Sequence, residues 1–192
     1  MPTPNPAAME FLLTRRSRPS KTLTAPVPAR AALMPILTAA ARSPDHGKLE
    51  PWRFIVLERV ALDRLARFVE VRGTALGKSL EDTQKARRAY DEAGLVVAVI
   101  ASPKPSDKIP AIEQTYSAGA VCLALLNAAQ ASGWGANWLT GWAAHDRDFC
   151  ITGLGLAAHE SVAGMIHIGT ETTPPPDRPR PDIATITTWV SE

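Results

Sequence analysis

The sequence has little cysteine, little excess charge of either sign and no long hydrophobic segment. Its two cysteines, Cys122 and Cys150, stand far apart without a CxxC or zinc-like spacing, so we predict reduced structural thiols. The 21 basic and 19 acidic side chains leave a net charge of only +2, which excludes a broad electrostatic field for nucleic acid. Any anion site must therefore be local.

Signals for membrane insertion or export are also missing. The longest apolar run, near residues 118–131, is interrupted by Asn127 and Gln130 and is too short to span a bilayer. At the N-terminus the basic residues follow the hydrophobic ones, which is the reverse of a secretory signal. We therefore expect a cytoplasmic protein that makes no membrane contact.

The length and composition suit a globular enzyme or binding protein. With 192 residues, 45% of them hydrophobic, the chain can bury a sizeable core as one domain or as one protomer of an intertwined oligomer. Neither an internal repeat nor a linker to a second domain is visible. We therefore treat residues 1–192 as a single domain.

Helical and extended patterns follow one another irregularly. Helix-like spacing of apolar residues marks residues 9–16, 31–42, 109–132 and 147–154, with one or two surface helices in 59–92 separated near Gly73 and Gly77. Strand-like patterns mark 52–57, 94–101 and 161–170, and 136–142 is a loop or short strand. This irregular mixture, with no GxGxxG motif after a strand, predicts an α+β fold with a mixed sheet flanked by helices, in preference to a Rossmann fold.

Four of these segments carry more specific predictions. Residues 94–101 form a continuous apolar run, which is typical of a central strand covered on both faces. The helix over 109–132 is rich in small apolar residues and is expected to be a core or dimer helix. Pro35 must delay or kink the helix over 31–42. Residues 183–190 are expected to be a terminal extension or an edge strand.

The first candidate site is the basic segment Arg15-Arg16-Ser17-Arg18. Three guanidinium groups and a hydroxyl this close together can bind a phosphate through charge-assisted, bidentate hydrogen bonds. From composition alone, however, a solvated basic helix end that complements the helix dipole is favoured.

The second candidate is the turn over residues 42–48, which contains Arg42, Pro44, Asp45, His46 and Lys48 and precedes a predicted strand. Polar groups on a rigid turn in this position commonly face a pocket. A metal pair is disfavoured, because adjacent side chains point apart and no second histidine cluster has ligand spacing. Asp45 as the cap of a turn with His46 exposed beside it is the plainer alternative.

The third candidate covers residues 133–142 and combines three tryptophans with small residues. Glycine lets a planar ligand approach the backbone, and tryptophan can form a wall beside it. A core-packing segment would also use tryptophan, so the pattern alone leaves both interpretations open.

The order of these three segments resembles the nitroreductase family, in its short-chain branch. The resemblance rests on Arg15-Arg16-Ser17, on Pro44-Asp45-His46 leading to a Pro-Trp-Arg-Phe strand, and on a late Trp-x-Thr-Gly segment before an Ile-Gly-Thr strand. Each motif is short, but together they cover nearly the whole chain.

The resemblance implies an intertwined homodimer that binds FMN at its interface and uses NAD(P)H as co-substrate, with no metal. The flavin carries out the hydride transfer, so no side chain is needed as a nucleophile. The implied roles are phosphate and ribityl contacts for Arg15, Arg16 and Ser17, an approach to the cofactor from the same or the partner chain for Arg42 and His46, and the lining of the flavin ring for Trp138, Leu139 and Thr140.

Two positions depart from the family pattern. Leu139 stands where an arginine can occur, and Glu50 precedes Pro51 where an amide is familiar. Loss of a basic group at Leu139 would weaken contacts to an anion, and an acidic Glu50 would disfavour a reduced, anionic flavin unless it faces solvent. From charge alone, Arg178 or Arg180 in the proline-rich tail could compensate at the phosphate.

The resemblance leads to two functional hypotheses. The first is an FMN-dependent oxidoreductase that passes a hydride from NAD(P)H through flavin N5 to an electron-poor small molecule such as a nitroaromatic or a quinone. The second is a flavin-binding protein that sequesters or remodels FMN without nicotinamide turnover. The fold alone does not choose between these two hypotheses, because one fold can host different reactions. A third hypothesis, a structural or interaction protein, would require all three motifs to be incidental.

Overall fold

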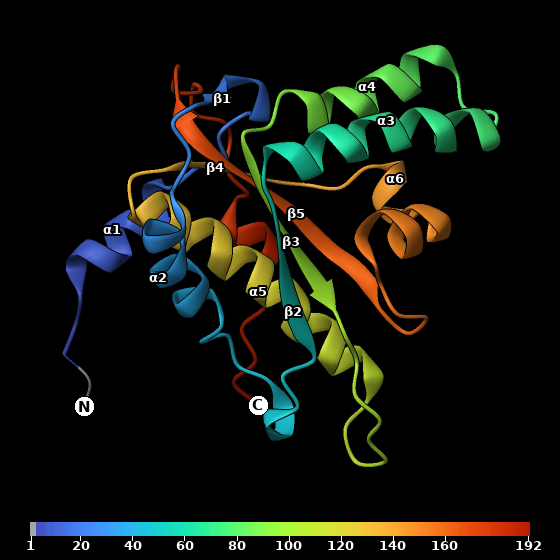
Figure 1. Ribbon diagram of the computed structural model, residues 1–192. Helices are drawn as coiled ribbons and strands as arrows, with labels where there is room; N and C mark the ends of the chain where they lie inside the picture. The colour runs from blue at the N-terminus through green and yellow to red at the C-terminus, as the bar shows by residue number, and fades with distance from the viewer. Residues whose placement is uncertain (1–2) are drawn as a thin grey trace.

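The computed structural model describes residues 3–192 and shows a five-stranded antiparallel sheet between two layers of helices (Figure 1). β5 (Ser161–Glu171) pairs with β3 (Leu95–Ala101) on one side, and on the other with β4 (Gly135–Leu139) and β1 (Leu23–Thr24). β3 pairs in turn with β2 (Trp52–Leu57), which ends the sheet. The predicted α+β fold is confirmed, although every strand pair of the described sheet is antiparallel where a mixed sheet was predicted.

Each face of the sheet carries its own hydrophobic core. On one face, α2 (Arg30–Ala40) and α5 (Ala111–Ala131) pack against alternate side chains of β3 and β5. On the other lie α3 (Arg59–Ala75), α4 (Leu80–Asp91), α6 (Trp142–His145) and a π-helical turn, Phe149–Gly153. Because both faces are covered, β3 is buried from Leu95 to Ile100, as its unbroken apolar run predicts.

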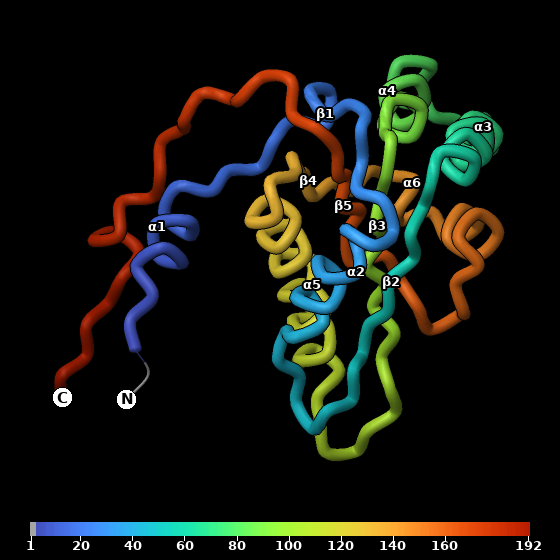
Figure 2. The backbone as a smooth tube through the Cα atoms, turned by 60° about the vertical axis from the view of Figure 1, so that its left-hand side comes forward, coloured from blue at the N-terminus to red at the C-terminus, as the bar shows by residue number. Residues whose placement is uncertain are grey.

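The two ends of the chain lie outside this core. No residue of α1 (Pro6–Thr14) is buried, and the C-terminal segment is exposed from residue 182 onward, with one short 3-10 turn at Ile183–Ile186. Figure 2 shows the C-terminal segment passing α1, apart from the body of the fold. Of the two predictions for residues 183–190, the structure shows the extension; the edge strand is not formed within the described residues.

Two local predictions need correction, and a third is confirmed. Of the two alternatives for Pro35, a late start of the helix is wrong, because α2 runs through Pro35 with the buried Leu33 and Ile36 on either side; the kink stays a prediction. Gly73 lies inside α3, where a side chain would meet Thr83 of α4, and only Gly77, at φ +62°, separates the two helices. The short helix predicted over 147–154 is confirmed, with a π-helical turn at Phe149–Gly153 inside it.

Within residues 3–192, no helix has both the length and the apolar character that crossing a membrane would require.

Candidate functional site

A cavity of about 680 Å³ lies on the face of the sheet that α4 and α6 cover. We call it the sheet cavity. Its walls come from the segment that follows α1, from α4 and from the loop between β4 and α6, and its floor comes from β4 and β5. Among its lining residues are Lys21, Asp82, Lys85, Leu139, Thr140 and His167.

The floor of the sheet cavity follows from strand alternation. β4 and β5 are antiparallel, with Asn137 opposite His167 and Leu139 opposite Met165. All four side chains line the cavity, because residues two apart on a strand share one face. The polar pair and the apolar pair therefore lie side by side across the two strands.

Trp138 points to the opposite face of β4. A side chain built at Gly164 would lie 2.2 Å from Trp138 Nε1 and 2.9 Å from Cys122 Sγ of α5, so the indole packs over this glycine. The prediction groups Trp138 with Leu139 and Thr140 around one ligand. The structure separates them within one chain, because successive residues of a strand face opposite ways.

A second cavity, of about 320 Å³, is built from four arginines and is called here the arginine cavity. The segment after α1 supplies Arg15, Arg16 and Ser17, and the C-terminal segment supplies Arg178 to Pro181. Burial, followed by repulsion from Arg180 and Arg18, lowers the pKa of Arg15. The cavity is thus a strongly positive and partly buried site.

Two buried guanidinium atoms of this cavity have no partner among the described protein groups. Arg15 Nε and Arg16 Nη1 are buried without a hydrogen-bond partner, and Arg15 Nη2 lies 3.4 Å from Ser17 Oγ. Asp177 is the nearby acid, and its carboxylate lies 3.3 Å from Arg180 Nη2. An unpaired buried donor costs about 1–3 kcal/mol, so these atoms fit a phosphate that would accept from them.

Three hydrogen bonds fix the segment between the two cavities. Gln130 Nε2 donates to Arg16 O at 2.8 Å, Arg18 N donates to Ala136 O at 2.9 Å, and Asn137 Nδ2 donates to Arg18 O at 2.7 Å. Ser17 lines the arginine cavity and Pro19 lines the sheet cavity. Two residues of chain span at most about 7 Å, so the two cavities adjoin.

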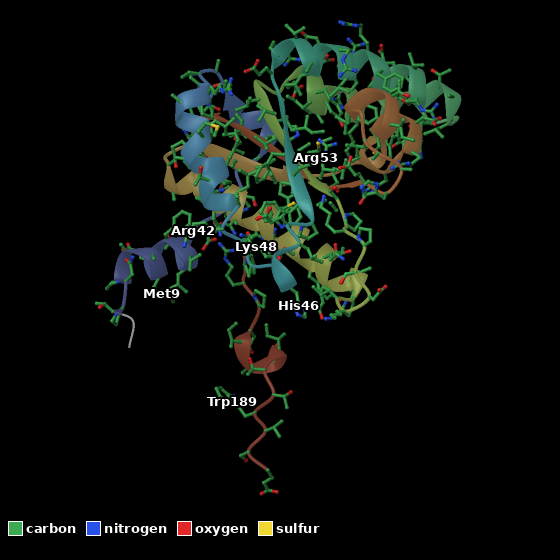
Figure 3. All side chains as sticks on the ribbon, turned by 60° about the horizontal axis from the view of Figure 1, so that its bottom comes forward. Met9, Arg42, His46, Lys48, Arg53 and Trp189 are labelled. Atoms are coloured by element: carbon green, nitrogen blue, oxygen red, sulfur yellow. The ribbon has the colours of Figure 1, made fainter. Side chains whose placement is uncertain are left out.

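The turn that contains Arg42 and His46 lies at the other end of α5 (Figure 3). Asp45 accepts hydrogen bonds from the backbone N–H groups of Leu49 at 2.8 Å and Glu50 at 3.2 Å, so it acts as the turn cap. His46 Nδ1 lies 2.6 Å from Glu113 Oε2 in the first turn of α5. No cluster of histidine, cysteine or acidic residues suited to a metal occurs within residues 3–192.

This turn is held in an unusual backbone conformation. Gly47, Lys48 and Glu50 have φ values of +71°, +55° and +47°, a region that non-glycine residues rarely adopt. Ser117 Oγ of α5 fixes the turn by donating to Pro44 O at 2.9 Å. Such strain is tolerated where the surroundings over-determine the structure, commonly beside a ligand.

The arginine cavity and the His46 turn are far apart in one chain. Arg16 is anchored to Gln130 near the end of α5, whereas His46 contacts Glu113 near its start. These two positions are about 25 Å apart along the helix axis. His46 therefore cannot reach the arginine cavity of its own chain.

The comparison with known proteins decides the family. Residues 12–170 match the family described as "Nitroreductase family". The chain belongs to the nitroreductase family.

Two curated relatives have similar length. The chain is 33% identical over 163 residues to "Putative NAD(P)H nitroreductase YdjA" of Escherichia coli (strain K12), a match that covers 85% of this chain and 87% of that protein. It is 35% identical over 165 residues to a protein of Haemophilus influenzae, also named an NAD(P)H nitroreductase, covering 85% and 88%.

Solved structures confirm the nitroreductase fold. A "Nitroreductase-like Family Protein" from Bacillus cereus superposes with a TM-score of 0.79 at 21% identity and covers 99% of this chain and 98% of that one. A nitroreductase solved in complex with FMN, from Desulfovibrio desulfuricans, gives a TM-score of 0.75 at 21% identity, with coverage of 98% and 99%.

In this nitroreductase-family chain, the predicted residues fall into separate groups. Arg15, Arg16 and Ser17 share the arginine cavity, and Leu139 and Thr140 share the sheet cavity beside it. Arg42 and His46 lie at the far end of α5, and Trp138 faces away from both cavities. Sequence reasoning missed other residues that line the sheet cavity, namely Lys21, Asp82, Lys85 and His167.

Signals for two of these missed residues are weak but recognisable. Lys21 follows Ser17 on the same short segment, so a longer reading of the basic motif would have included it. His167 interrupts an otherwise apolar stretch of β5. The α4 residues could not be found in this way, because a charged helix face looks the same whether it borders solvent or a cavity.

Proposed function

We propose that this chain is an FMN-dependent oxidoreductase that takes a hydride from NAD(P)H and passes it to an electron-poor acceptor such as a nitroaromatic or a quinone. The observation that carries the proposal is the pair of buried, unpaired guanidinium atoms of Arg15 and Arg16 in a cavity that adjoins a second, larger one. Family membership, the NAD(P)H in the names of both curated relatives and the FMN bound to a structural neighbour support it.

The arginine cavity would hold the phosphate. Arg15 and Arg16 can donate charge-assisted hydrogen bonds from atoms that already lack partners, and Ser17 offers a hydroxyl. Arg178 and Arg180 add positive charge from the other end of the chain. These two arginines would compensate, at the phosphate, for the positive charge that is lost because position 139 is a leucine and not an arginine.

The sheet cavity would hold the flavin ring. When bound, the flavin supplies the chemistry of accepting a hydride and donating it again. The chain's own residues orient the ring and exclude water from its buried face. Lys21 and Lys85 place positive charge in the wall near Asp82, which would stabilise an occupant that gains negative charge on reduction.

The proposed active form is a homodimer with two shared sites. Two α5 helices related by a two-fold axis and running antiparallel would bring the His46 end of one beside the Arg16 end of the other. This arrangement would account for the implied cofactor role of His46, which lies too far from the arginine cavity of its own chain. A partner would also cover three exposed surfaces. These are α1, which has no buried residue, the C-terminal segment, whose Trp189 lies far from the sheet (Figure 3), and the outer edge of β2.

The visible spectrum of the purified protein tests the proposal. Bound oxidised FMN should make the protein yellow, and anaerobic NADH or NADPH should bleach it. A yellow protein that neither nucleotide bleaches would favour the second hypothesis, a flavin-binding protein without nicotinamide turnover. A colourless protein that cannot be reconstituted with FMN would contradict both.

A further inference from the structure

His167 is a buried polar side chain in an apolar stretch of β5. It is 5% exposed, while Met165, Ile166 and Ile168 around it form part of the two hydrophobic cores. Its ring lies on the floor of the sheet cavity, beside Asn137 of β4. A core position would be filled more stably by another aliphatic residue, because burial of a polar ring without partners is unfavourable.

The imidazole has no hydrogen-bond partner among the described groups. Asn137, directly opposite, already donates its amide to Arg18 O. Burial is the one cause that shifts the pKa of His167, which falls to about 4. The ring is therefore neutral near pH 7 and presents one N–H donor and one bare nitrogen acceptor.

Apart from Asn137, the other polar groups that line the sheet cavity differ from His167 in charge or position. Lys21, Lys85 and Arg88 are cationic, Asp82 and Glu92 are anionic, and all five lie in its walls. Tyr90 is also buried in the lining, and burial raises the pKa of its phenol, so it too stays neutral. On the floor, the Asn137 amide already donates a hydrogen bond to Arg18 O, whereas the His167 ring can both donate and accept a hydrogen bond from a ligand.

We propose that His167 is a cofactor-binding residue that hydrogen-bonds a heteroatom at the polar edge of the flavin ring. The inference rests on the proposed function and deepens it. A flavin carries N–H and C=O groups on one edge and an apolar benzenoid ring on the other. The floor matches this division, with Asn137 and His167 forming one pair and Leu139 and Met165 the other.

His167 would contact the flavin ring, whereas the arginine cavity would bind the phosphate, so two ligands that differ only in the phosphate can distinguish the two sites. Riboflavin has the ring of FMN and lacks its phosphate. Replacement of His167 should weaken both ligands by the same factor, since both contain the ring. Replacement of Arg15 and Arg16 should weaken FMN much more than riboflavin, because riboflavin lacks the phosphate that these residues would bind.

The experiment titrates apoprotein with FMN and with riboflavin and follows the quenching of flavin fluorescence. We expect His167→Leu to raise the Kd of each ligand about tenfold, the effect of one lost hydrogen bond in a buried site. His167→Gln keeps a donor and an acceptor and should recover part of the affinity. The matched control is His159→Leu, the same change at an exposed position, which should alter neither Kd.

Thermal unfolding of the apoprotein supplies a second readout. Because His167 is unpartnered in the empty cavity, His167→Leu should leave the apoprotein Tm unchanged or raise it, while the gain in Tm on adding FMN becomes smaller. A lower apoprotein Tm together with unchanged flavin affinities would show a structural role and overturn the inference.

Two other outcomes are also decisive. If the wild-type protein binds FMN tightly and His167→Leu binds both flavins equally well, the proposed function stands and the inference fails. If the wild-type protein binds neither flavin after reconstitution, the proposed function fails and the inference fails with it.

Discussion

Arg53 on β2 and Glu160 at the start of β5 form a two-pronged ion pair, with Nε 2.7 Å from Oε1 and Nη2 2.8 Å from Oε2. The Glu160 side chain is buried and also accepts from the backbone N–H of Ala157 at 2.9 Å. The hydrogen bond from Arg53 is the main cause that lowers the pKa of Glu160 to about 2. This pair connects the edge strand to the loop before β5, on the side of the sheet away from the arginine cavity.

Glu160→Gln should therefore destabilise the fold. It removes the buried carboxylate and leaves Arg53 without its partner, so the free energy of unfolding in urea should fall by about 3 kcal/mol at pH 7. Asp63→Asn, at the exposed ion pair with Arg59, is the matched control and should cost less than 1 kcal/mol, or about the value of a surface pair. Equal effects of the two changes would contradict the importance of burial.

The same ion pair should make the stability of the fold depend on pH in the acid range. The folded-state pKa of Glu160 is depressed, so its contribution is fully present above about pH 4.5 and is lost as the pH falls toward about 2. Urea unfolding of wild type and Glu160→Gln across this range should show a gap between them that narrows with acid. A gap that widens on acidification would show that the sign is wrong.

The Arg178→Ala, Arg180→Ala double variant tests the tail's role at the phosphate. Removal of two positive charges from the arginine cavity should lower FMN affinity by one to two orders of magnitude, or about 1.4 kcal/mol per lost tenfold. Fluorescence titration of the apoprotein measures the change. Arg67→Ala, an exposed arginine on α3, is the control, and unchanged FMN affinity in the double variant would rule out the tail contact.

Mixed dimers test whether each site draws on two chains. A variant with Arg15 and Arg16 replaced by alanine and a variant with Arg42 and His46 replaced by alanine should each bind FMN poorly. Unfolded together and refolded, they should recover roughly a quarter of the wild-type FMN sites, because each mixed dimer contains one intact site. A site built from a single chain would give no recovery, which bound flavin absorbance would reveal.

Gly164→Ala tests the packing of Trp138. The added methyl would lie 2.2 Å from Trp138 Nε1, so the indole must move and its fluorescence maximum should shift while Tm falls. In a Trp138→Ala background only the contact with Cys122 Sγ at 2.9 Å remains, so the cost of Gly164→Ala should be partly relieved. A cost that is the same in both backgrounds would place the strain elsewhere.

The sequence was sufficient for the family and for most of the fold. The unbroken apolar run at residues 94–101 predicted a central strand, and the irregular mixture of patterns predicted an α+β class; both are confirmed. Pro35 and Gly73 misled because tertiary packing outweighs local preference, which a pattern of single residues does not contain. The extent of the domain and the homodimer stay predictions.

The site was harder to predict because it depends on side-chain direction and on distance. Motif order grouped Trp138 with Leu139, yet adjacent strand residues face opposite ways. The same order suggested that Arg16 and His46 act together, and the structure places them at opposite ends of α5. The roles of the predicted site residues therefore stay predictions, and His46 would need a partner chain to reach an arginine cavity.

The arginine cavity lies between the segment that follows α1 and the C-terminal segment, and each segment contributes two arginines. Among the described residues, Arg15 Nε and Arg16 Nη1 have no partner across the cavity. A phosphate in that position would accept hydrogen bonds from both segments and hold them together. Loss of the cofactor would then release both termini together. The prolines of residues 173–181 block trypsin at Arg178 and Arg180, so the stretch Arg15-Arg16-Ser17 is the one that would become open to trypsin. Resistance of that stretch to digestion would serve as a measure of flavin loading that needs neither colour nor turnover.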